Sequence, residues 1–417
     1  MLKKRSTMMN KNFKNRFDTN NKNLQYKKQI VDYYIHNGPD TLTVLSKVLD
    51  ISVPTASKFV SELCDTKILT NYGKLETAGG RHPYLYGLDP TECFFVGVDF
   101  TPGKMHCAVM NLRGERVYEQ MNIPFDFANT QACLDQIGKE VSRFVDNCPQ
   151  GRQGIVSIGI NIFGRLNPAT GYSYTYFNFS EIPLGKTLSQ EIGIPTYIDN
   201  DSRACAYGEY MTHFLHHGKN MLFVNVAWGL GLGIILDGHP YNGKSGFSGE
   251  FGHIHIYDNE VLCHCGKKGC IQTEASGLAL HRKFIEKINK GGNSTLLEKY
   301  DLSKGPLEEQ ITLDDLIEAT QQEDILCIEI LEDVGEQLGK QIAGLINLFN
   351  PDIVVVGGAL SKTGDHLMHP LRSSIRKYSL NMVNQDTALK ISYLQSYAGV
   401  MGACMLARKK AIEDLTA

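Results

Sequence analysis

The chain has 417 residues, of which 42% are hydrophobic and 21% charged, with a formal net charge of −3, so it has room for two or three ordinary globular domains. No apolar run approaches the roughly 18 residues of a membrane span, and the basic, Asn-rich N-terminus lacks the apolar stretch of a secretory signal. Eleven cysteines, scattered apart from one cluster, favour reduced thiols plus one metal site over a disulfide framework. Reduced thiols are typical of the cytoplasm, so we expect a cytoplasmic protein, and we expect it not to bind membranes.

The charge is unevenly distributed along the chain. Residues 1–90 contain 14 Lys and Arg against 8 Asp and Glu, which leaves a net charge of −9 on residues 91–417. A basic head on an acidic body is consistent with a head that binds the phosphates of a nucleic acid and a body that does not. A basic disordered tail without any binding partner would have the same charge. Charge alone therefore permits nucleic-acid binding without establishing it.

Residues 1–20 are polar, basic and aperiodic, and we expect them to form a disordered tail. In residues 21–90, the spacing of apolar residues predicts three helices: one from Leu24 to Asn37, one capped by Thr41 or Thr43, and one capped by Ser52 with Pro54 in its first turn. Two short helices joined by a tight turn, followed by a β-hairpin around Tyr72-Gly73, are typical of a winged helix-turn-helix domain.

The third helix is the candidate recognition helix. Its apolar face consists of Val53, Ala56, Phe59, Val60 and Leu63. Its other residues are small or cationic and suit entry into the major groove: Ser52, Thr55, Ser57, Lys58 and Ser61. After the wing, Gly79-Gly80-Arg81 supplies a cation that could reach phosphate or a narrow minor groove. A three-helix protein-docking module has the same helical pattern, but the wing and the basic tail favour double-stranded DNA.

Residues 91–417 alternate between strand-like and helical patterns, which indicates α/β architecture with mainly parallel or mixed sheets. We expect strands at residues 94–99, 106–112, 155–160, 196–198, 222–226, 233–236 and 353–356. We expect helices at residues 130–148, 201–217, 276–290, 312–349 and 397–412. Early hairpins at residues 94–112 and 221–236 suggest two related lobes.

A cluster of metal-ligating residues lies within residues 249–272. Cys263, Cys265 and Cys270 place three thiolates on one glycine-turned loop, and His253 lies ten residues before the first of them. Three sulfurs and one imidazole suit a tetrahedral structural Zn²⁺ site, which has no open position and therefore organises rather than catalyses. His255 and His264 compete with His253 for the place of fourth ligand.

Two acidic elements suggest a ligand site. Asn200 and Asp201 follow a strand and open a helix, at the carboxyl end of the strand where open α/β sheets bind ligands, although taken alone either residue is more often a plain helix cap. Glu250 precedes His253 by three residues, and a zinc-bound His can donate its outer N–H to a ligand hydroxyl. Fixed carboxylates and amides suit a polyhydroxyl ligand, because each can pair with two adjacent hydroxyls.

From about residue 24 to 404 these features resemble the ROK family (repressors, open reading frames and kinases), and within it the NagC-, Mlc- and XylR-like regulators that carry a winged head. The most specific matches are Asn200-Asp201, Gly249-Glu250-Phe251-Gly252-His253 and Cys263-x-Cys265-Gly266-x-x-Gly269-Cys270. Less specific are Gly79-Gly80-Arg81, Gly164-Arg165 and Asn350-Pro351-Asp352 followed by Gly357-Gly358.

The resemblance implies an actin-like, two-lobed sugar-kinase fold with sugar bound in a cleft. It implies a first lobe at residues 91–198, on which helix 397–412 packs back, and a second lobe with the zinc loop at residues 199–396. It assigns a sugar-binding role to Gly164, Arg165, Asn200, Asp201, Glu250 and His253, and zinc ligation to His253, Cys263, Cys265 and Cys270. In a kinase of the family, Asp201 would be the general base.

Three departures from the family pattern are informative. The Asp-x-Gly-Gly-Thr phosphate loop of the kinases reads Asp99-Phe100-Thr101-Pro102-Gly103 here, where proline removes an N–H donor and phenylalanine adds bulk. Their Gly-Thr-Gly-x-Gly loop reads Ala227-Trp228-Gly229-Leu230-Gly231, so Trp228 replaces the hydroxyl that would meet phosphate. The family's sugar-binding Glu after the last zinc cysteine is Gln272, which keeps hydrogen-bonding reach but loses the charge.

Damaged phosphate loops beside retained sugar contacts predict a sensor and not an enzyme. We expect a sugar-responsive repressor of carbohydrate-use genes that binds a palindromic operator and a monosaccharide or sugar-phosphate effector. One short recognition helix offers few contacts, so a homodimer or homotetramer is expected. The alternatives are an ATP-dependent sugar kinase with a regulatory head, and an oligomeric scaffold with a vestigial cleft.

Overall fold

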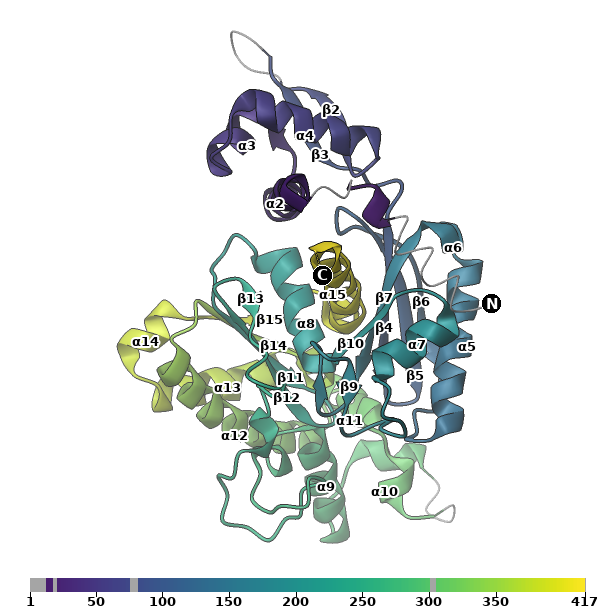
Figure 1. Ribbon diagram of the computed structural model, residues 1–417. Coiled ribbons are helices and arrows are strands. Elements are labelled where there is room, and N and C mark those ends of the chain that lie inside the picture. The colour runs from purple at the N-terminus through teal and green to yellow at the C-terminus, as the bar shows by residue number, and fades with distance from the viewer. Residues whose placement is uncertain (1–12, 18–20, 76–81, 301–304, 417) are drawn as a thin grey trace. The chain divides into compact units, whose positions relative to one another are not determined.

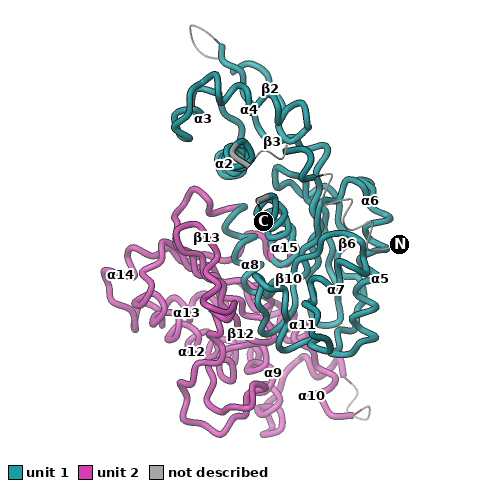
Figure 2. Tube along the Cα trace, in the orientation of Figure 1, with its two compact units in different colours: residues 1–212, 399–417 teal, residues 213–398 magenta. Residues whose placement is uncertain are grey.

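The computed structural model describes residues 13–17, 21–75, 82–300 and 305–416 (Figure 1). The chain folds into two compact units, Met1–Thr212 with Gly399–Ala417, and His213–Ala398 (Figure 2). The first unit thus extends past the expected boundary at residue 198. It does so because α8 (Asp201–Glu209) packs closely on α15 (Ala398–Glu413): a Cβ on Gly402 of α15 would lie 1.8 Å from the carbonyl oxygen of Ala204.

The head, residues 21–90, has the predicted winged helix-turn-helix order. Its helices are α2 (Asn21–Asn37), α3 (Leu42–Val48) and α4 (Val53–Asp65), and its sheet has the order β1-β3-β2, from β1 (Asp40–Thr41), β2 (Leu69–Lys74) and β3 (Tyr84–Leu88). Thr41 caps α3 and Ser52 caps α4, the latter by accepting a hydrogen bond from the Thr55 N–H at 3.2 Å. The antiparallel β2–β3 pair is the predicted wing, but Tyr72 and Gly73 lie inside β2, at an irregularity in the pairing, and do not form the turn. Gly79, Gly80 and Arg81 lie outside the described residues.

The expected disorder of the whole tail, residues 1–20, does not hold for residues 13–17. This segment forms a helical turn in which Phe13 and Phe17 are fully buried. The ring of Phe13 packs edge-on against Phe95, with 6.5 Å between centroids. Two aromatic side chains in an otherwise polar tail bury enough apolar surface to hold this turn on the body of the first unit.

The first unit contains a five-stranded sheet with the order β10-β7-β4-β5-β6. Its strands are β4 (Phe94–Thr101), β5 (Lys104–Asn111), β6 (Arg116–Pro124), β7 (Ile155–Ile162) and β10 (Thr196–Asn200). β10, β7 and β4 run parallel, whereas β4, β5 and β6 form an antiparallel meander. Figure 1 shows α5 (Gln131–Asn147) and α7 (Leu184–Ile192) on one face of this sheet and α8 and α15 on the other.

Helix α15 lies directly on the backbone of two central strands. A Cβ on Gly97 in β4 would lie 2.1 Å from the Val400 carbonyl oxygen, and one on Gly159 in β7 would lie 2.2 Å from that of Ala403. Only glycine permits so close an approach. The far end of α15 is followed by a turn at Asp414–Thr416, which packs against α2 of the head.

The second unit contains a sheet of the same design, with the order β13-β12-β11-β14-β15. Its strands are β11 (Met221–Val226), β12 (Leu230–Leu236), β13 (His239–Pro240), β14 (Ile353–Gly357) and β15 (Ala388–Ile391). β11, the earliest strand, begins an antiparallel meander with β12 and β13 on one side, and on the other side β14 and β15 follow in parallel. β4 has the same place in the first sheet. The expectation of two related lobes in an α/β fold is therefore confirmed.

The helices of the second unit are α9 (Gly277–Asn289), α10 (Leu307–Gln310), α11 (Leu313–Gln321), α12 (Ile325–Phe349), α13 (Asp365–Tyr378) and α14 (Asn381–Asp386). The single helix expected at residues 312–349 is two helices, α11 and α12. The break occurs because Glu323 has a positive φ of 63° and Asp324 caps α12, accepting a hydrogen bond from the Cys327 N–H. The helix expected at residues 201–217 continues past α8 as a π-helical turn, Tyr210–Phe214.

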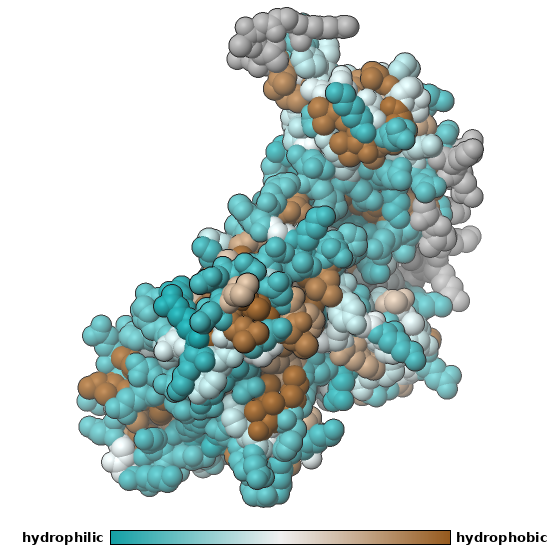
Figure 3. Space-filling model, turned by 90° about the vertical axis from the view of Figure 1, so that its left-hand side faces the viewer, coloured by the Kyte–Doolittle hydropathy of each residue, from teal (hydrophilic) through white to brown (hydrophobic). Residues whose placement is uncertain are grey.

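Among the described residues, no helix is both long and apolar enough to cross a membrane. On the face seen in Figure 3, apolar residues form separate patches within a mainly polar surface. Scattered apolar residues of this kind are ordinary on globular proteins.

Candidate functional site

The carboxyl edge of the first sheet brings together three residues of the predicted sugar site. β10 ends at Asn200, and α8 begins at Asp201. Asn200 caps α8 through its Oδ1, which accepts from the N–H groups of Ser202 and Arg203 at 3.0 and 3.3 Å. Its Nδ2 donates to Asp201 Oδ1 at 2.8 Å and to the Gly164 carbonyl at 3.2 Å. Asn200 therefore acts as a helix cap and also joins the Gly164 loop to Asp201.

The Gly164 loop depends on its glycine. Gly164 has a φ of +79°, and a Cβ there would lie 2.7 Å from the Cβ of Thr175. Thr175 fixes the next residue as well, because its Oγ1 accepts from the Arg165 N–H at 3.0 Å. The Arg165 side chain is exposed. Sequence reasoning missed Thr175, which belongs to no motif and reaches the loop only through the fold.

Two carboxyl groups lie at this edge: Asp99 is buried and Asp201 is half-buried. Asn161 of β7 donates from Nδ2 to Asp99 Oδ1 at 2.8 Å and to the Gly399 carbonyl at 2.9 Å. Burial raises the pKa of Asp99 to about 7; the hydrogen bond from Asn161 opposes this rise, and the negative charge of Asp201 adds to it. Burial also raises the pKa of Asp201, against hydrogen bonds from the Ser202 N–H and Asn200 and the charge of Arg203. Both groups can therefore hold or accept a proton closer to neutral pH than an ordinary carboxyl.

In the second unit, the predicted metal ligands converge. One ligand atom from each of His253, Cys263, Cys265 and Cys270 lies within 4.8 Å of all the others. The Sγ atoms of Cys265 and Cys270 are 3.7 Å apart, and Cys263 Sγ lies 3.6 Å from His253 Nδ1. The folded chain thus brings together a Cys/His group that could hold a metal ion.

The two competing histidines are engaged elsewhere. The Nδ1 of His255 lies 3.0 Å from the Lys268 carbonyl oxygen, and the Nδ1 of His264 lies 2.8 Å from Gln272 Nε2. His253 instead turns Nδ1 toward the thiols and Nε2 toward Glu250, whose Oε2 is 3.9 Å away. This is the orientation that the predicted Glu250–His253 pair requires.

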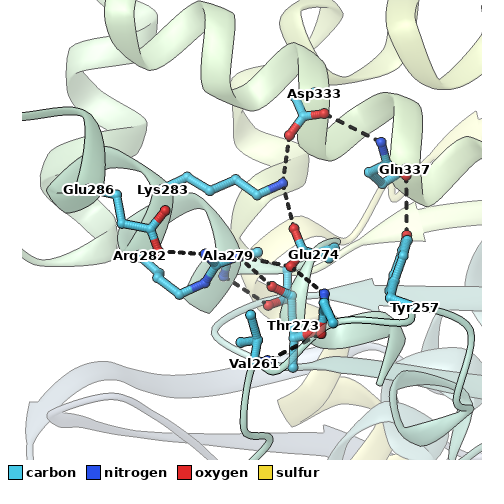
Figure 4. Close-up of polar contacts among 12 residues, drawn as sticks. Tyr257, Val261, Thr273, Glu274, Ala279, Arg282, Lys283, Glu286, Asp333 and Gln337 are labelled. Atoms are coloured by element: carbon cyan, nitrogen blue, oxygen red, sulfur yellow. Dashed lines mark hydrogen bonds and ion pairs between the residues drawn. The ribbon is translucent and has the colours of Figure 1, made fainter. Parts of the chain in front are cut away.

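Gln272, predicted to contact sugar, is only 2% exposed. Its Nε2 lies 3.0 Å from Cys263 Sγ, so the structure places this side chain against the thiol loop. Nearby Glu274 cannot take over as a sugar-binding carboxylate, because ion pairs occupy it (Figure 4). Its Oε1 lies 3.0 Å from Arg282 Nη2 and its Oε2 lies 2.9 Å from Lys283 Nζ.

The chain matches known proteins over most of its length. Residues 95–410 match the ROK family. The chain belongs to the ROK family. A xylose repressor from Caldicellulosiruptor bescii is 29% identical over 364 residues, which cover 86% of this chain and 89% of the repressor. A solved ROK family transcriptional regulator, described as a homolog of the Escherichia coli Mlc protein, superposes with a TM-score of 0.77 at 26% identity, covering 94% of this chain and 96% of that one.

The ROK family also includes enzymes that are similar to this chain. A glucokinase from Halalkalibacterium halodurans is 29% identical over 324 residues. That match covers 96% of the glucokinase but only 77% of this chain, which leaves about a quarter of the chain without a counterpart. The ROK regulators, by contrast, extend over 86% or more of the chain. The share of this chain that is matched thus differs between the ROK regulators and the ROK glucokinase.

The first ROK phosphate loop is a tight two-residue turn in this chain. Thr101 of β4 pairs with Lys104 of β5, so only Pro102 and Gly103 lie between the strands. The Gly103 carbonyl accepts from the Phe125 N–H at 3.0 Å. Phe100 is buried and packs on Phe125, with 5.3 Å between ring centroids. The turn has no glycine pair, and its proline offers no N–H to a phosphate.

The second ROK phosphate loop binds the N-terminus of α9 through its carbonyl oxygens. The carbonyl oxygens of Ala227 and Trp228 accept from the N–H groups of Gly277 and Leu278, at 2.8 and 2.9 Å, at the start of α9. Trp228 is 42% exposed and lies over His281, with 5.5 Å between ring centroids. Amides that would otherwise be available to an anion at a helix N-terminus are therefore already bonded.

In the head, Ser57, Lys58 and Ser61 are exposed on α4, as predicted. Thr55 is half-buried, and Ser52 shares its hydroxyl with Thr55 Oγ1 at 2.7 Å. Val53, expected on the apolar face, is instead 45% exposed. Val53 is the first residue of α4 and lies at the end of the apolar face, beyond the residues that pack into the core.

Proposed function

We propose that this ROK protein is a sugar-responsive DNA-binding transcriptional repressor. The observation that carries the proposal is the combination, in one chain, of a winged helix-turn-helix head with a ROK body that keeps the candidate sugar contacts but has Pro102 and Trp228 in its two phosphate loops. The xylose repressor and the ROK regulator match both the head and the body in extent. A body that binds a ligand without transferring phosphate can act as a sensor whose state changes the DNA binding of the head.

The effector is a monosaccharide or sugar phosphate. Asn200 and Asp201 carry amide and carboxylate groups, and Glu250 and His253 carry carboxylate and imidazole groups, of the kinds that pair with hydroxyls. Gly164 and Arg165 complete the set of candidate contacts. Sugar releases the head from DNA only if it binds the released state more tightly than the DNA-bound state.

A gel shift on the DNA upstream of the chain's own gene, with a panel of monosaccharides and their phosphates, tests this function. We expect the protein to shift this DNA and at least one sugar to weaken the complex. If no sugar alters the affinity for DNA, the sensor proposal fails.

We infer that the Cys/His site binds zinc. A tetrahedron with Zn–S bonds of about 2.3 Å and Zn–N bonds of about 2.0–2.1 Å has S···S edges of about 3.8 Å and S···N edges of about 3.6 Å. The separations of 3.7 Å between Cys265 and Cys270 and of 3.6 Å between Cys263 and His253 support this assignment. Bound zinc would supply a fixed bond to His253, which would hold its outer nitrogen toward Glu250.

A kinase activity is the competing function, favoured by the raised pKa of Asp201, a carboxyl group placed like a general base. A coupled ADP-release assay with the same sugar panel separates the two. We expect no turnover above background; a rate within about a hundredfold of typical enzymes would make the chain a kinase. In a sensor, Asp201→Ala changes only the response of DNA binding to sugar.

We propose further that the protein binds its operator as a homodimer or a dimer of dimers. One α4 helix contacts too few base pairs for operator-level specificity, so two heads on a palindrome are needed. Sedimentation of the protein with a single operator duplex should give two chains, or four, for each DNA. One chain for each duplex would contradict this stoichiometry.

A further inference from the structure

The side chain of Gln272 is enclosed by protein at both ends of its amide. Its nitrogen lies 3.0 Å from Cys263 Sγ and 2.8 Å from His264 Nδ1. Its oxygen faces Gly229 and Gly252, where an added Cβ would be 3.6 and 3.1 Å from Oε1. With 2% of the residue exposed, this amide has no open side on which to meet a sugar.

The chemistry of its neighbours fixes which way the amide faces. A metal-bound thiolate can only accept hydrogen bonds, so the NH₂ end must face Cys263. The second N–H then reaches His264 Nδ1, which accepts it and leaves the proton of that ring on Nε2. The His264 ring in turn stands edge-on to His253, with 5.2 Å between centroids and 81° between planes. The Gln272 amide thereby connects the ligand Cys263 to His264, and His264 packs against the ligand His253.

We propose that Gln272 is a positioning residue of the metal site: its amide stabilises the Cys263 thiolate and holds His264 against His253, and it does not read the sugar. The proposal rests on the zinc assignment made above. A glutamate at this position would have no N–H groups and would bring a negative charge to within about 3 Å of a thiolate, so the amide suits the role and the carboxylate does not.

The proposal predicts that Gln272→Glu weakens zinc binding by about 10- to 100-fold, the usual effect of losing a hydrogen bond to a metal ligand. Zinc affinity is measured on the full chain, without DNA or sugar, by competition with a chromophoric chelator. Gln385→Glu is the matched control, because it makes the same change at an exposed position on α14 of the same unit. This control should keep the affinity of the wild-type protein.

Cobalt(II) supplies a second readout that a purely structural role would not change. A thiolate that loses its N–H donor becomes a stronger electron donor, so the sulfur-to-cobalt absorption band should shift in Gln272→Glu and in the neutral variant Gln272→Met. Gln272→Met has no added charge and keeps the test valid if the glutamate variant fails to fold.

The outcomes are separable. Weaker zinc binding with a shifted cobalt band in the variants, and unchanged sugar affinity in zinc-saturated Gln272→Met, would establish the positioning role. Zinc affinity within threefold of wild type together with a loss of sugar binding would overturn it and return Gln272 to the sugar site. A wild-type chain that binds no zinc would instead overturn the zinc assignment itself and this proposal with it, without bearing on DNA binding.

Discussion

Lys58 lies exposed on α4, the candidate recognition helix, with its ammonium 6.0 Å from the centroid of the Phe59 ring. If Lys58 neutralises a DNA phosphate, Lys58→Ala should weaken binding to specific and nonspecific DNA alike. The slope of log affinity against log salt should fall in magnitude by about 1 for each recognition helix engaged. Fluorescence anisotropy over a salt series measures both effects.

Lys186→Ala provides the comparison, because this lysine is also exposed but lies on α7, which is not part of the head. Its removal should leave the salt slope unchanged. An equal loss in both variants would mean that Lys58 acts only through the net charge of the protein.

Asp99 should make the stability of the protein depend on pH. Its pKa is about 7 in the folded chain and near 3.8 in an unfolded one, so the folded state holds a proton that the unfolded state releases. The contribution of Asp99 to stability is therefore lost as pH rises from about 4 to about 7, and it changes little above that range. Asp99→Asn, which keeps an oxygen for Asn161, should reduce this loss.

Urea unfolding at pH 5 and pH 8 measures the effect as the difference between the variant and the wild-type protein. The exposed residue Asp386 supplies the control Asp386→Asn, which should show the same pH dependence as wild type. A wild-type slope retained in Asp99→Asn would assign the pH dependence to other groups.

At this scale, the sequence predicted what lies close together along the chain. The three cysteines and His253 share one loop region, and Asn200 precedes Asp201, so spacing alone identified them. Asn161 was not predicted, because its contacts to Asp99 and Gly399 join segments that are distant in sequence. The assignment of Gln272 to the sugar site came from a family pattern, and only the fold shows that its amide nitrogen lies beside Cys263 and His264.

Among the elements, α15 packs against other backbone segments with no space for added side-chain atoms at Gly402. Gly402→Ala should lower the free energy of unfolding by about 1–3 kcal/mol, because the new Cβ would meet the backbone of Ala204 and force α15 away from α8. Gly344→Ala in α12 is the matched change, since a Cβ there meets nothing within 4 Å. It should raise stability by about 0.5–1 kcal/mol through helix propensity alone. Calorimetry distinguishes the two signs.

The polar network of Figure 4 should stabilise the second unit by linking α9 and α12 to the segment after the last cysteine. Glu274→Gln leaves Arg282 and Lys283 without their shared carboxylate and should cost about 2 kcal/mol. Glu286→Gln removes only the exposed partner of Arg282 and should cost less than about 1 kcal/mol. Because Trp228 is the single tryptophan and lies in this unit, its fluorescence during urea unfolding reports the change directly.

Elements with strong apolar periodicity were predictable, including all seven expected strands of the body and the three helices of the head. The break between α11 and α12 was not, because both segments have the same helical period and the interruption depends on Asp324, whose carboxylate also accepts from Ser294 and Thr295. The edge strands β6 and β15 were missed because their half-exposed sequences lack a continuous apolar run.

For the molecule as a whole, metal removal should affect the two units unequally. Chelation should abolish hydrogen-exchange protection in residues 249–274 and lower the unfolding temperature reported by Trp228. Protection in the head and the first sheet should persist, because the four ligands all lie in the second unit. A Cys263→Ser/Cys265→Ser variant should show no further change with chelator. Equal loss of protection in both units would contradict a local structural role for the metal.

The first unit is assembled from two distant stretches of the chain. The chain leaves this unit after Thr212 and re-enters it at Gly399, in α15. A ribosome therefore releases the whole head well before the helix that covers one face of the first sheet. An interrupted chain would carry a DNA-binding head on a sheet whose glycine-lined surface, at Gly97 and Gly159, lies bare, and such a fragment is prone to aggregation and proteolysis. We therefore expect a chain that ends before residue 399 to be lost before its head occupies DNA, although the head itself is complete.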